Sequence, residues 1–175
     1  PGMDLLNVLT ARFPNIQFIA EDLGYLTPEV QQLLRDSGFP GMKVLQFAFD
    51  SREAANYLPH TYTAHCVCYA GTHDNAPLMA WKDEAAPADI AVARQYLGLH
   101  KEEGFHWGVL RGGQSSVADL FVAQMQDYLG LGAASRMNTP GIPDGNWRWR
   151  MLPGQLTEEL SRKIAGMTRL YGREP

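Results

Sequence analysis

Three clusters of polar side chains follow directly on apolar, strand-like runs of the sequence. Glu21 and Asp22 follow "QFIA", residues 71–75 ("GTHDN") follow "CVCYA", and Gln126 and Asp127 follow "LFVAQM". In parallel sheets and in barrels alike, ligands bind at the carboxyl ends of the strands. These three clusters are therefore the candidate functional residues of the chain.

The first cluster is a pair of adjacent carboxyl groups, Glu21 and Asp22. A carboxyl group at the rim of an apolar strand loses solvation, and its pKa rises. A general acid that works near neutral pH needs this property. For Glu21 the sequence leaves a catalytic and a structural role equally open. For Asp22, which precedes a turn, we favour a helix N-cap or a salt bridge at the strand rim.

The second cluster brings His73, Asp74 and Asn75 together after a tight exit from the strand. A histidine donor beside a carboxylate could bind vicinal hydroxyls and offset positive charge. The structural alternative is an Asx turn that caps a helix beginning near Pro77.

A metal site and a disulfide are both disfavoured. A metal site would recruit the nearby histidines and one carboxylate, and their spacing matches no ligand pattern; the residues concerned are His60, His65, His73 and Asp74. Cys66 and Cys68 are too close in sequence for a disulfide, and on a strand they face the same side. We expect two small buried thiols, no metal and no cofactor.

The overall composition limits the class of protein. The 175 residues are 45% hydrophobic with a formal net charge of -4, which fits one globular domain and argues against nucleic acid or an anionic membrane as partner. There is no apolar run of about 18 residues and no signal-peptide pattern. Reduced thiols fit a location in the cytoplasm. The chain opens at Pro1 with Met3 inside a helix-like pattern, as expected of a fragment.

The elements that must position these clusters are helices alternating with short apolar strands. The expected helices are Met3–Arg12, Thr27–Ser37, Pro77–Trp81, Pro87–Leu97, Phe105–Arg111 and Thr157–Leu170. The expected strands are Ile16–Ala20, Met42–Phe49, His65–Gly71 and Ala118–Met125, the last ending in a helical turn. Continuous apolar strands separated by helices or long loops indicate a parallel sheet covered on both faces.

Aromatic side chains in two loops could stack on sugar rings, because they present flat apolar faces. They are Tyr57, Tyr62, Trp147 and Trp149. For any single one of them, packing in the core or within a loop is the more common role.

Five longer segments then carry a resemblance to a known family. They are "IAEDLGYLTPEV", "GFPGMKVLQFAF", "YLPHTYTAHCVCYAGTHDN", "SRMNTPG" and "NWRWRMLPG", and they occur in this order. Together they resemble the C-terminal half of 4-α-glucanotransferases of glycoside hydrolase family 77, the amylomaltases or disproportionating enzymes, from about Asp4 to Leu170. The resemblance implies an α/β fold: the C-terminal half of a (β/α)8 TIM barrel with about four parallel strands. Residues 1–175 would all belong to one catalytic barrel whose N-terminal half is absent.

The same resemblance implies the reaction and its residues. The family transfers α-1,4-glucan segments between maltooligosaccharides by a retaining double displacement. Glu21 resembles the general acid/base, and Asp74 resembles the transition-state stabiliser. Substrate-binding positions are His73, Asn75, Phe47, Arg136 and Asn138. The nucleophilic aspartate of the family has no counterpart in this chain.

The resemblance leaves two kinds of protein open. One is the acid/base half of a glucanotransferase, inactive as an isolated chain and dependent on its other half. The other is a non-catalytic module for glucan binding or assembly. Ala76 stands where the family commonly has a polar residue, so the start of the following helix is a point of departure.

Overall fold

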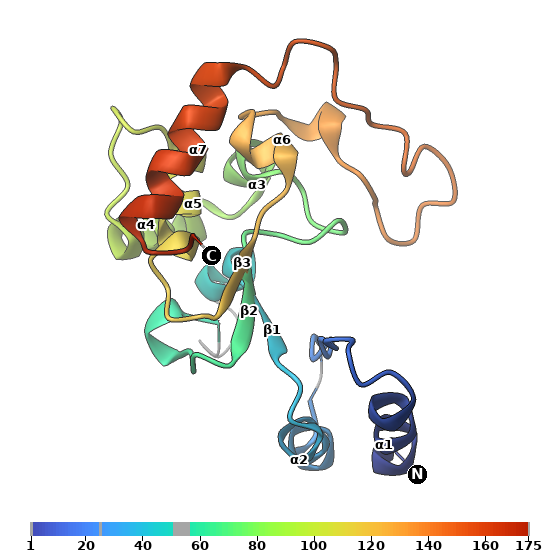
Figure 1. Ribbon diagram of the computed structural model, residues 1–175. Coiled ribbons are helices and arrows are strands. Elements are labelled where there is room, and N and C mark those ends of the chain that lie inside the picture. Colours follow the sequence, from blue (N-terminus) through green and yellow to red (C-terminus); the bar gives the residue numbers. More distant parts are fainter. Residues whose placement is uncertain (1, 25, 51–56, 175) are drawn as a thin grey trace.

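The computed structural model describes residues 2–24, 26–50 and 57–174, in which helices precede, separate and follow the strands (Figure 1). The strands are β1 (Gly41–Val44), β2 (Cys66–Tyr69) and β3 (Leu120–Val122). The α-helices are α1 (Gly2–Arg12), α2 (Pro28–Ser37), α3 (Leu78–Glu84), α4 (Pro87–Leu97), α5 (Phe105–Gln114), α6 (Met125–Tyr128) and α7 (Glu158–Leu170). Three short 3-10 turns complete the set: η1 (Leu45–Phe49), η2 (Pro59–Thr61) and η3 (Ala133–Ser135).

The strands form one parallel sheet in the order β1-β2-β3. Gly41 pairs with Cys66, and Val67 pairs with Leu120. The expected α/β class and parallel sheet are confirmed. Parallel neighbours end on the same side, so the segments that follow the three strands meet at one edge of the sheet.

The predicted number of strands was wrong, because the described residues contain three strands rather than four. Residues 16–20 do not pair as a strand; Ala20 donates its N–H to the carbonyl of Pro40 at 3.0 Å. The run Met42–Phe49 is also divided: its first part lies in β1 and the rest forms η1. An apolar run does not by itself distinguish a strand from a buried helical turn.

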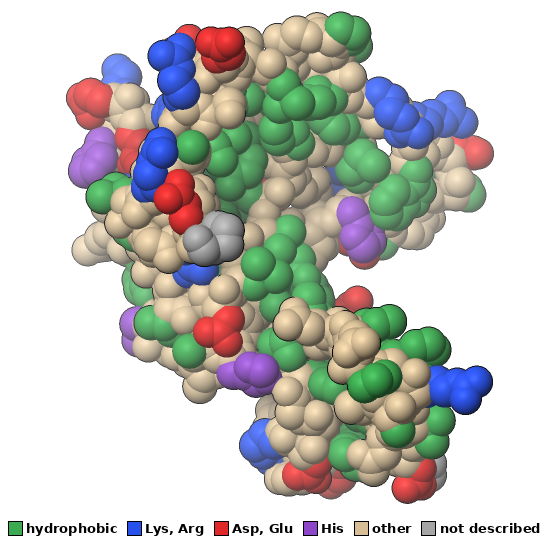
Figure 2. All heavy atoms as spheres, viewed as in Figure 1, with side chains coloured by type: hydrophobic (Ala, Val, Ile, Leu, Met, Phe, Trp, Pro, Cys, Tyr) green, Lys and Arg blue, Asp and Glu red, His purple; other side chains and the backbone are tan. Residues whose placement is uncertain are grey.

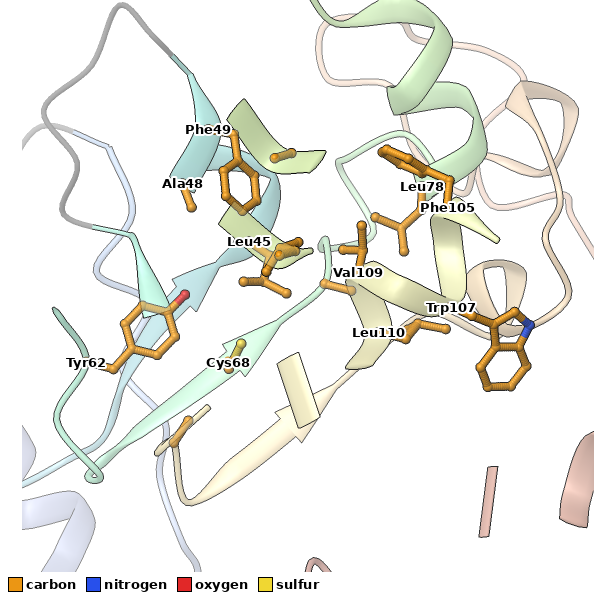
Figure 3. Packing of buried hydrophobic residues seen from close by; sticks show 14 of the residues in the cluster. Leu45, Ala48, Phe49, Tyr62, Cys68, Leu78, Phe105, Trp107, Val109 and Leu110 are labelled. Atoms are coloured by element: carbon orange, nitrogen blue, oxygen red, sulfur yellow. The ribbon is translucent and has the colours of Figure 1, made fainter. Parts of the chain in front are cut away.

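The hydrophobic core lies between the sheet, η1 and the helices α3 to α5 (Figure 3). Leu45 from η1, Cys68 from β2, Leu78 from α3 and Val109 from α5 are each completely buried. Burial of such side chains contributes about 1.5–3 kcal/mol each. The end of β2, which leads into residues 71–75, is therefore attached to the best-packed part of the chain.

Local sequence signals explain where two helices begin and end. Thr27 accepts the N–H of Val30 at 3.4 Å and caps α2, which ends at Gly38 with φ of 66°. Thr157 caps α7 in the same way through Leu160. The predicted helix Thr27–Ser37 is thus confirmed, and both caps follow from the ordinary chemistry of helix termini.

The helices α1 and α2 pack on each other, away from the main core (Figure 1). Large apolar side chains of this N-terminal part are exposed, namely Leu5, Val8, Phe13, Ile16 and Ile19. Within the described residues β1 is an edge strand. An exposed edge beside exposed apolar side chains is the arrangement that natural proteins normally cover.

None of the described helices is long and apolar enough to cross a membrane.

Candidate active site

The segment after β2 folds into a tight turn that presents Asp74. The Oδ1 atom of Asn75 accepts hydrogen bonds from the backbone N–H and the hydroxyl of Thr72, at 2.8 and 2.9 Å. The Asn75 N–H returns to the Thr72 carbonyl at 3.0 Å. The predicted Asx turn at the start of the helix was wrong: Asn75 accepts from Thr72, which precedes it, and α3 begins after Pro77 with no side-chain cap. Asn75 was predicted to bind substrate, and its Oδ1 is engaged in this turn.

Asp74 is contacted by the loop that follows α6, although the two are more than 60 residues apart. Asn138 donates its Nδ2–H to Oδ1 of Asp74 at 2.6 Å. Arg136 donates to the backbone carbonyl of Asp74 at 2.6 Å and to the carbonyl of Asn138 at 2.9 Å. The structure therefore brings the predicted residues Asp74, Arg136 and Asn138 together. The Asp74 side chain stays 45% exposed, so a ligand can still reach it.

His73 lies on the same side of the turn. Its Nε2 is 3.3 Å from Oδ1 of Asp74, and its ring centroid is 5.0 Å from that of Trp147. The carbonyl of His73 accepts the N–H of Asn138 at 3.1 Å. Trp147 is exposed and has a positive φ of 62°, a conformation that costs a non-glycine residue about 1–3 kcal/mol.

Glu21 lines both hollows that Asp74 lines. The larger hollow, about 1220 Å³, is bordered by Glu21, Phe47, Asp74 and Asn75, with Lys43 and Tyr57 beside them. The smaller one, about 400 Å³, is bordered by Glu21, His73, Asp74 and Gln124. Figure 2 shows the molecule hollowed between the α1–α2 pair and the rest of the chain. Glu21 itself is exposed, and it faces the same space as Asp74.

Asp22 has a structural role. It is buried, and its Oδ1 accepts the N–H of Met42 at 2.6 Å, which attaches residues 21–22 to the beginning of β1. The partner is strand backbone rather than a helix N-terminus. A Cβ added to Gly41 would lie 2.8 Å from Oδ2 of Asp22, so only glycine leaves room for this carboxylate.

Replacing Gly41 with alanine is therefore expected to lower stability and to displace Glu21. The new methyl group must push the Asp22 carboxylate off the Met42 N–H, at a cost of about 1–3 kcal/mol. Thermal unfolding of the full-length polypeptide measures the effect. Gly166→Ala is the matched control, because a Cβ there meets nothing within 4 Å. Equal melting temperatures for the two variants would contradict the assignment.

The third predicted cluster is buried rather than open to a ligand. Asp127 is 1% exposed, and its Oδ1 accepts the N–H of Leu78 at 2.8 Å. Burial raises the pKa of Asp127 to about 6, against the opposing effect of hydrogen bonds from the backbone of Leu78 and Gln124. Gln126 is 3% exposed and donates to the carbonyl of Ser135 at 3.1 Å.

The histidines of the metal hypothesis do not converge. His60 contacts the hydroxyl of Tyr96 at 3.0 Å, and His65 contacts the carbonyl of Gly38 at 2.8 Å. Across residues 2–24, 26–50 and 57–174, no group of three or more His, Cys, Asp or Glu side chains is placed to hold a metal. Cys66 and Cys68 are free buried thiols, as expected, and burial raises the pKa of both.

The aromatic residues divide between packing and exposure. Tyr62 is buried and donates its hydroxyl proton to the carbonyl of Tyr57, so it belongs to the core and presents no face to a sugar. The rings of Phe47 and Tyr57 meet edge to face at 5.6 Å beside the larger hollow. Sequence reasoning missed Lys43, whose ammonium lies 5.6 Å from the Tyr57 centroid. A charged residue inside the apolar run "MKVLQFAF" was the available signal.

Comparison with known proteins gives matches along almost the whole chain. A family model described as 4-alpha-glucanotransferase, glycoside hydrolase family 77, matches residues 1–157. A 4-alpha-glucanotransferase of Clostridium butyricum is 45% identical over 174 residues, covering 99% of this chain and 36% of that protein. One from Thermus thermophilus is 44% identical, covering 95% of this chain and 35% of that protein. The chain thus spans about a third of the length of these relatives.

Solved structures agree with the sequence matches. An amylomaltase from Streptococcus agalactiae in complex with acarbose superposes with a TM-score of 0.93 at 35% identity, over 100% of this chain and 36% of that one. An amylomaltase from Corynebacterium glutamicum superposes with a TM-score of 0.65 at 19% identity, over 91% of this chain and 30% of that one, a likeness of fold.

Proposed function

Because the chain belongs to the 4-alpha-glucanotransferase family, glycoside hydrolase family 77, we propose that it is the C-terminal part of a single catalytic barrel in a longer polypeptide. That polypeptide transfers α-1,4-glucan segments between maltooligosaccharides. The observation that carries the proposal is that Glu21 and Asp74 border the same hollows, with Asp74 held by Asn138 and Arg136. A retaining glycosyl transfer requires an acid/base carboxyl group and a nucleophile; Glu21 is proposed to supply the first, and Asp74 adds a further carboxylate beside the reacting sugar.

Glu21 is the proposed general acid/base. As the glycosidic bond breaks, Glu21 gives its proton to the leaving oxygen, and the sugar carbon forms a bond to the nucleophile. In the second half-reaction Glu21 takes the proton of the acceptor hydroxyl, whose oxygen displaces the nucleophile. Its exposure at the hollow leaves room for both the leaving and the incoming sugar. We propose that the nucleophile is supplied by residues outside this chain.

Asp74 is proposed to stabilise the positive charge that develops on the reacting sugar. A fixed carboxylate does this without reorganising at the moment of reaction, which is where most electrostatic catalysis comes from. The hydrogen bond from Asn138 and the nearby Nε2 of His73 restrict its rotation. His73 and Asn138 are then in place to bind hydroxyls of the same sugar.

The substrates proposed are α-1,4-glucans and maltooligosaccharides. The rings of Phe47 and Tyr57 border the larger hollow and suit the C–H face of an acceptor sugar. The related amylomaltase that was solved with acarbose supports this class of ligand. The free buried thiols are consistent with a reducing compartment, and the cytoplasm is the proposed location.

The decisive experiment is a disproportionation assay. The full-length polypeptide, incubated with maltotriose, is expected to release glucose and to form longer maltooligosaccharides, resolved by anion-exchange chromatography. Residues 1–175 alone are expected to give neither product, because the proposed nucleophile lies elsewhere. Binding of maltotriose by the full-length protein without any turnover would favour the glucan-binding module instead. Turnover by the short chain would show that the nucleophile is within it.

A further inference from the structure

We propose that Gln124, Gln126 and Asp127, here called the brace, position Asp74 for the transfer reaction by holding the segments on either side of it. The proposal rests on the function proposed above and adds three positioning residues to it. None of the three is proposed to touch the substrate. They act through backbone groups of the turn after β2 and of the loop after α6.

Asp127 holds the segment that follows Asp74. Its Oδ1 accepts the N–H of Leu78, the first residue of α3 and only four residues after Asp74. The residue that precedes α3 is Pro77, which offers no side-chain cap, so Asp127 satisfies a helix N-terminal donor from another part of the chain. Both Leu78 and Asp127 are shielded from water, and water therefore does not replace the bond.

Gln124 holds the segment that precedes Asp74. It donates its Nε2–H to the carbonyl of Thr72 at 2.9 Å. Thr72 is also the residue whose N–H and hydroxyl bind Asn75. The turn that carries Asp74 is thus fixed at its first residue by Gln124 and beyond its last residue by Asp127.

Gln126 holds the loop that contacts Asp74 from the other side. Its Nε2–H donates to the carbonyl of Ser135, the residue before Arg136. Its own carbonyl accepts the N–H of Leu131, which closes the loop onto α6. Arg136 and Asn138, which both donate hydrogen bonds to Asp74, follow within three residues of Ser135. One short segment therefore fixes both the turn of Asp74 and the loop that binds it.

In the brace, Gln126 and Asp127 are buried and Gln124 is half-buried, so their polar atoms lose contact with water and need partners within the protein. Within the described residues, Oδ2 of Asp127 and Oε1 of Gln124 are buried without a hydrogen-bond partner. A buried polar atom without a partner is destabilising, but an apolar side chain at these positions would instead leave the Leu78 N–H and the carbonyls of Thr72 and Ser135 unpaired. The positioning role rests on the place of these bonds, because all three of the segments that the brace holds adjoin one carboxylate, Asp74.

The test compares variants of the full-length polypeptide in maltotriose disproportionation, well below their melting temperatures. Asp127→Ala and Gln126→Ala are each expected to lower kcat by about 10- to 100-fold with KM changed by less than about 3-fold, because a displaced carboxylate weakens the transition state more than binding. Asp127→Asn retains an oxygen that accepts from Leu78, and it is expected to stay within about 5-fold of the parent.

The matched control is Gln114→Ala. Gln114 is likewise a buried amide whose oxygen has no partner within the described residues, and its side chain contacts Tyr128 rather than the segments on either side of Asp74. It is expected to lower the melting temperature and to leave kcat within about 2-fold. If the brace variants behave as Gln114→Ala does, the proposal is wrong.

A crystal structure of Asp127→Ala separates this proposal from the function. The brace predicts that residues 72–78 shift and that the Asn138–Asp74 hydrogen bond lengthens beyond 3.5 Å or is lost. Unmoved residues 72–78 would overturn the brace whether or not the protein is an enzyme. A parent protein without turnover would instead overturn the proposed function, and the crystal structure would still decide the brace.

Discussion

Replacing Glu21 with glutamine in the full-length polypeptide is expected to reduce kcat for maltotriose disproportionation by about 10³-fold. Glutamine keeps the size and the hydrogen-bonding shape of the side chain but has no acidic proton to give to the leaving oxygen. Because Glu21 is exposed at the hollow and does not belong to the hydrophobic core, the fold should tolerate the change. Steady-state kinetics measure the loss, and calorimetric titration with maltotriose should show retained binding.

A substrate with a better leaving group makes the test specific to the acid role. α-Maltosyl fluoride needs little protonation to lose fluoride, so Glu21→Gln should release fluoride from it far faster than it turns over maltotriose. Glu102→Gln is the control, an exposed glutamate that borders neither hollow, and it should behave like the parent. Unchanged turnover of maltotriose by Glu21→Gln would remove Glu21 from the mechanism and favour a glucan-binding module.

Much of the fold was predictable because its signals are local. The caps at Thr27 and Gly38 set the ends of α2, and the apolar runs around Cys66 and Leu120 became β2 and β3. The wrong predictions concern apolar runs whose strand partners cannot be identified from the sequence. Residues 16–20 look like a buried strand in the sequence, yet a strand also needs a neighbouring strand to pair with. In the structure, this segment is joined to Pro40 by the N–H of Ala20 and has no strand partner among the described residues.

The candidate site was predicted in part for the same reason. Polar residues at strand ends marked Glu21 and Asp74, since that signal is contained in a few consecutive letters. The bond between Asn138 and Asp74 spans 64 residues, and residue spacing alone gives no indication of it. Asn138 was identified through the family resemblance instead. The direction in which Asp127 points was also beyond the sequence, which marked it as a strand-end carboxylate without showing that it faces the core.

Replacing Asp74 with asparagine is the second change expected to stop the reaction, again by about 10³-fold or more in kcat. The amide has nearly the shape of the carboxylate, and its oxygen can still accept from Asn138, so the turn should survive. What is lost is the negative charge, and preorganised charge near the reacting centre is usually the largest single contribution to catalysis. Binding of maltotriose, measured by calorimetry, should change much less than kcat does.

The contact with Asn138 supplies the internal control for Asp74. Asn138→Ala alone should cost about 10- to 100-fold in kcat, because the carboxylate is still present but no longer held at 2.6 Å from a donor. If Asn138 acts through Asp74, adding Asn138→Ala to the Asp74→Asn variant should have little further effect, since the charge that it orients is already gone. Fully additive losses would mean that the two side chains act separately, with Asn138 serving the substrate directly. Near-normal kcat in Asp74→Asn would mean that the hydrogen bonds of Asp74 with Arg136 and Asn138 only hold the loop in place. Another residue would then have to stabilise the charge on the sugar.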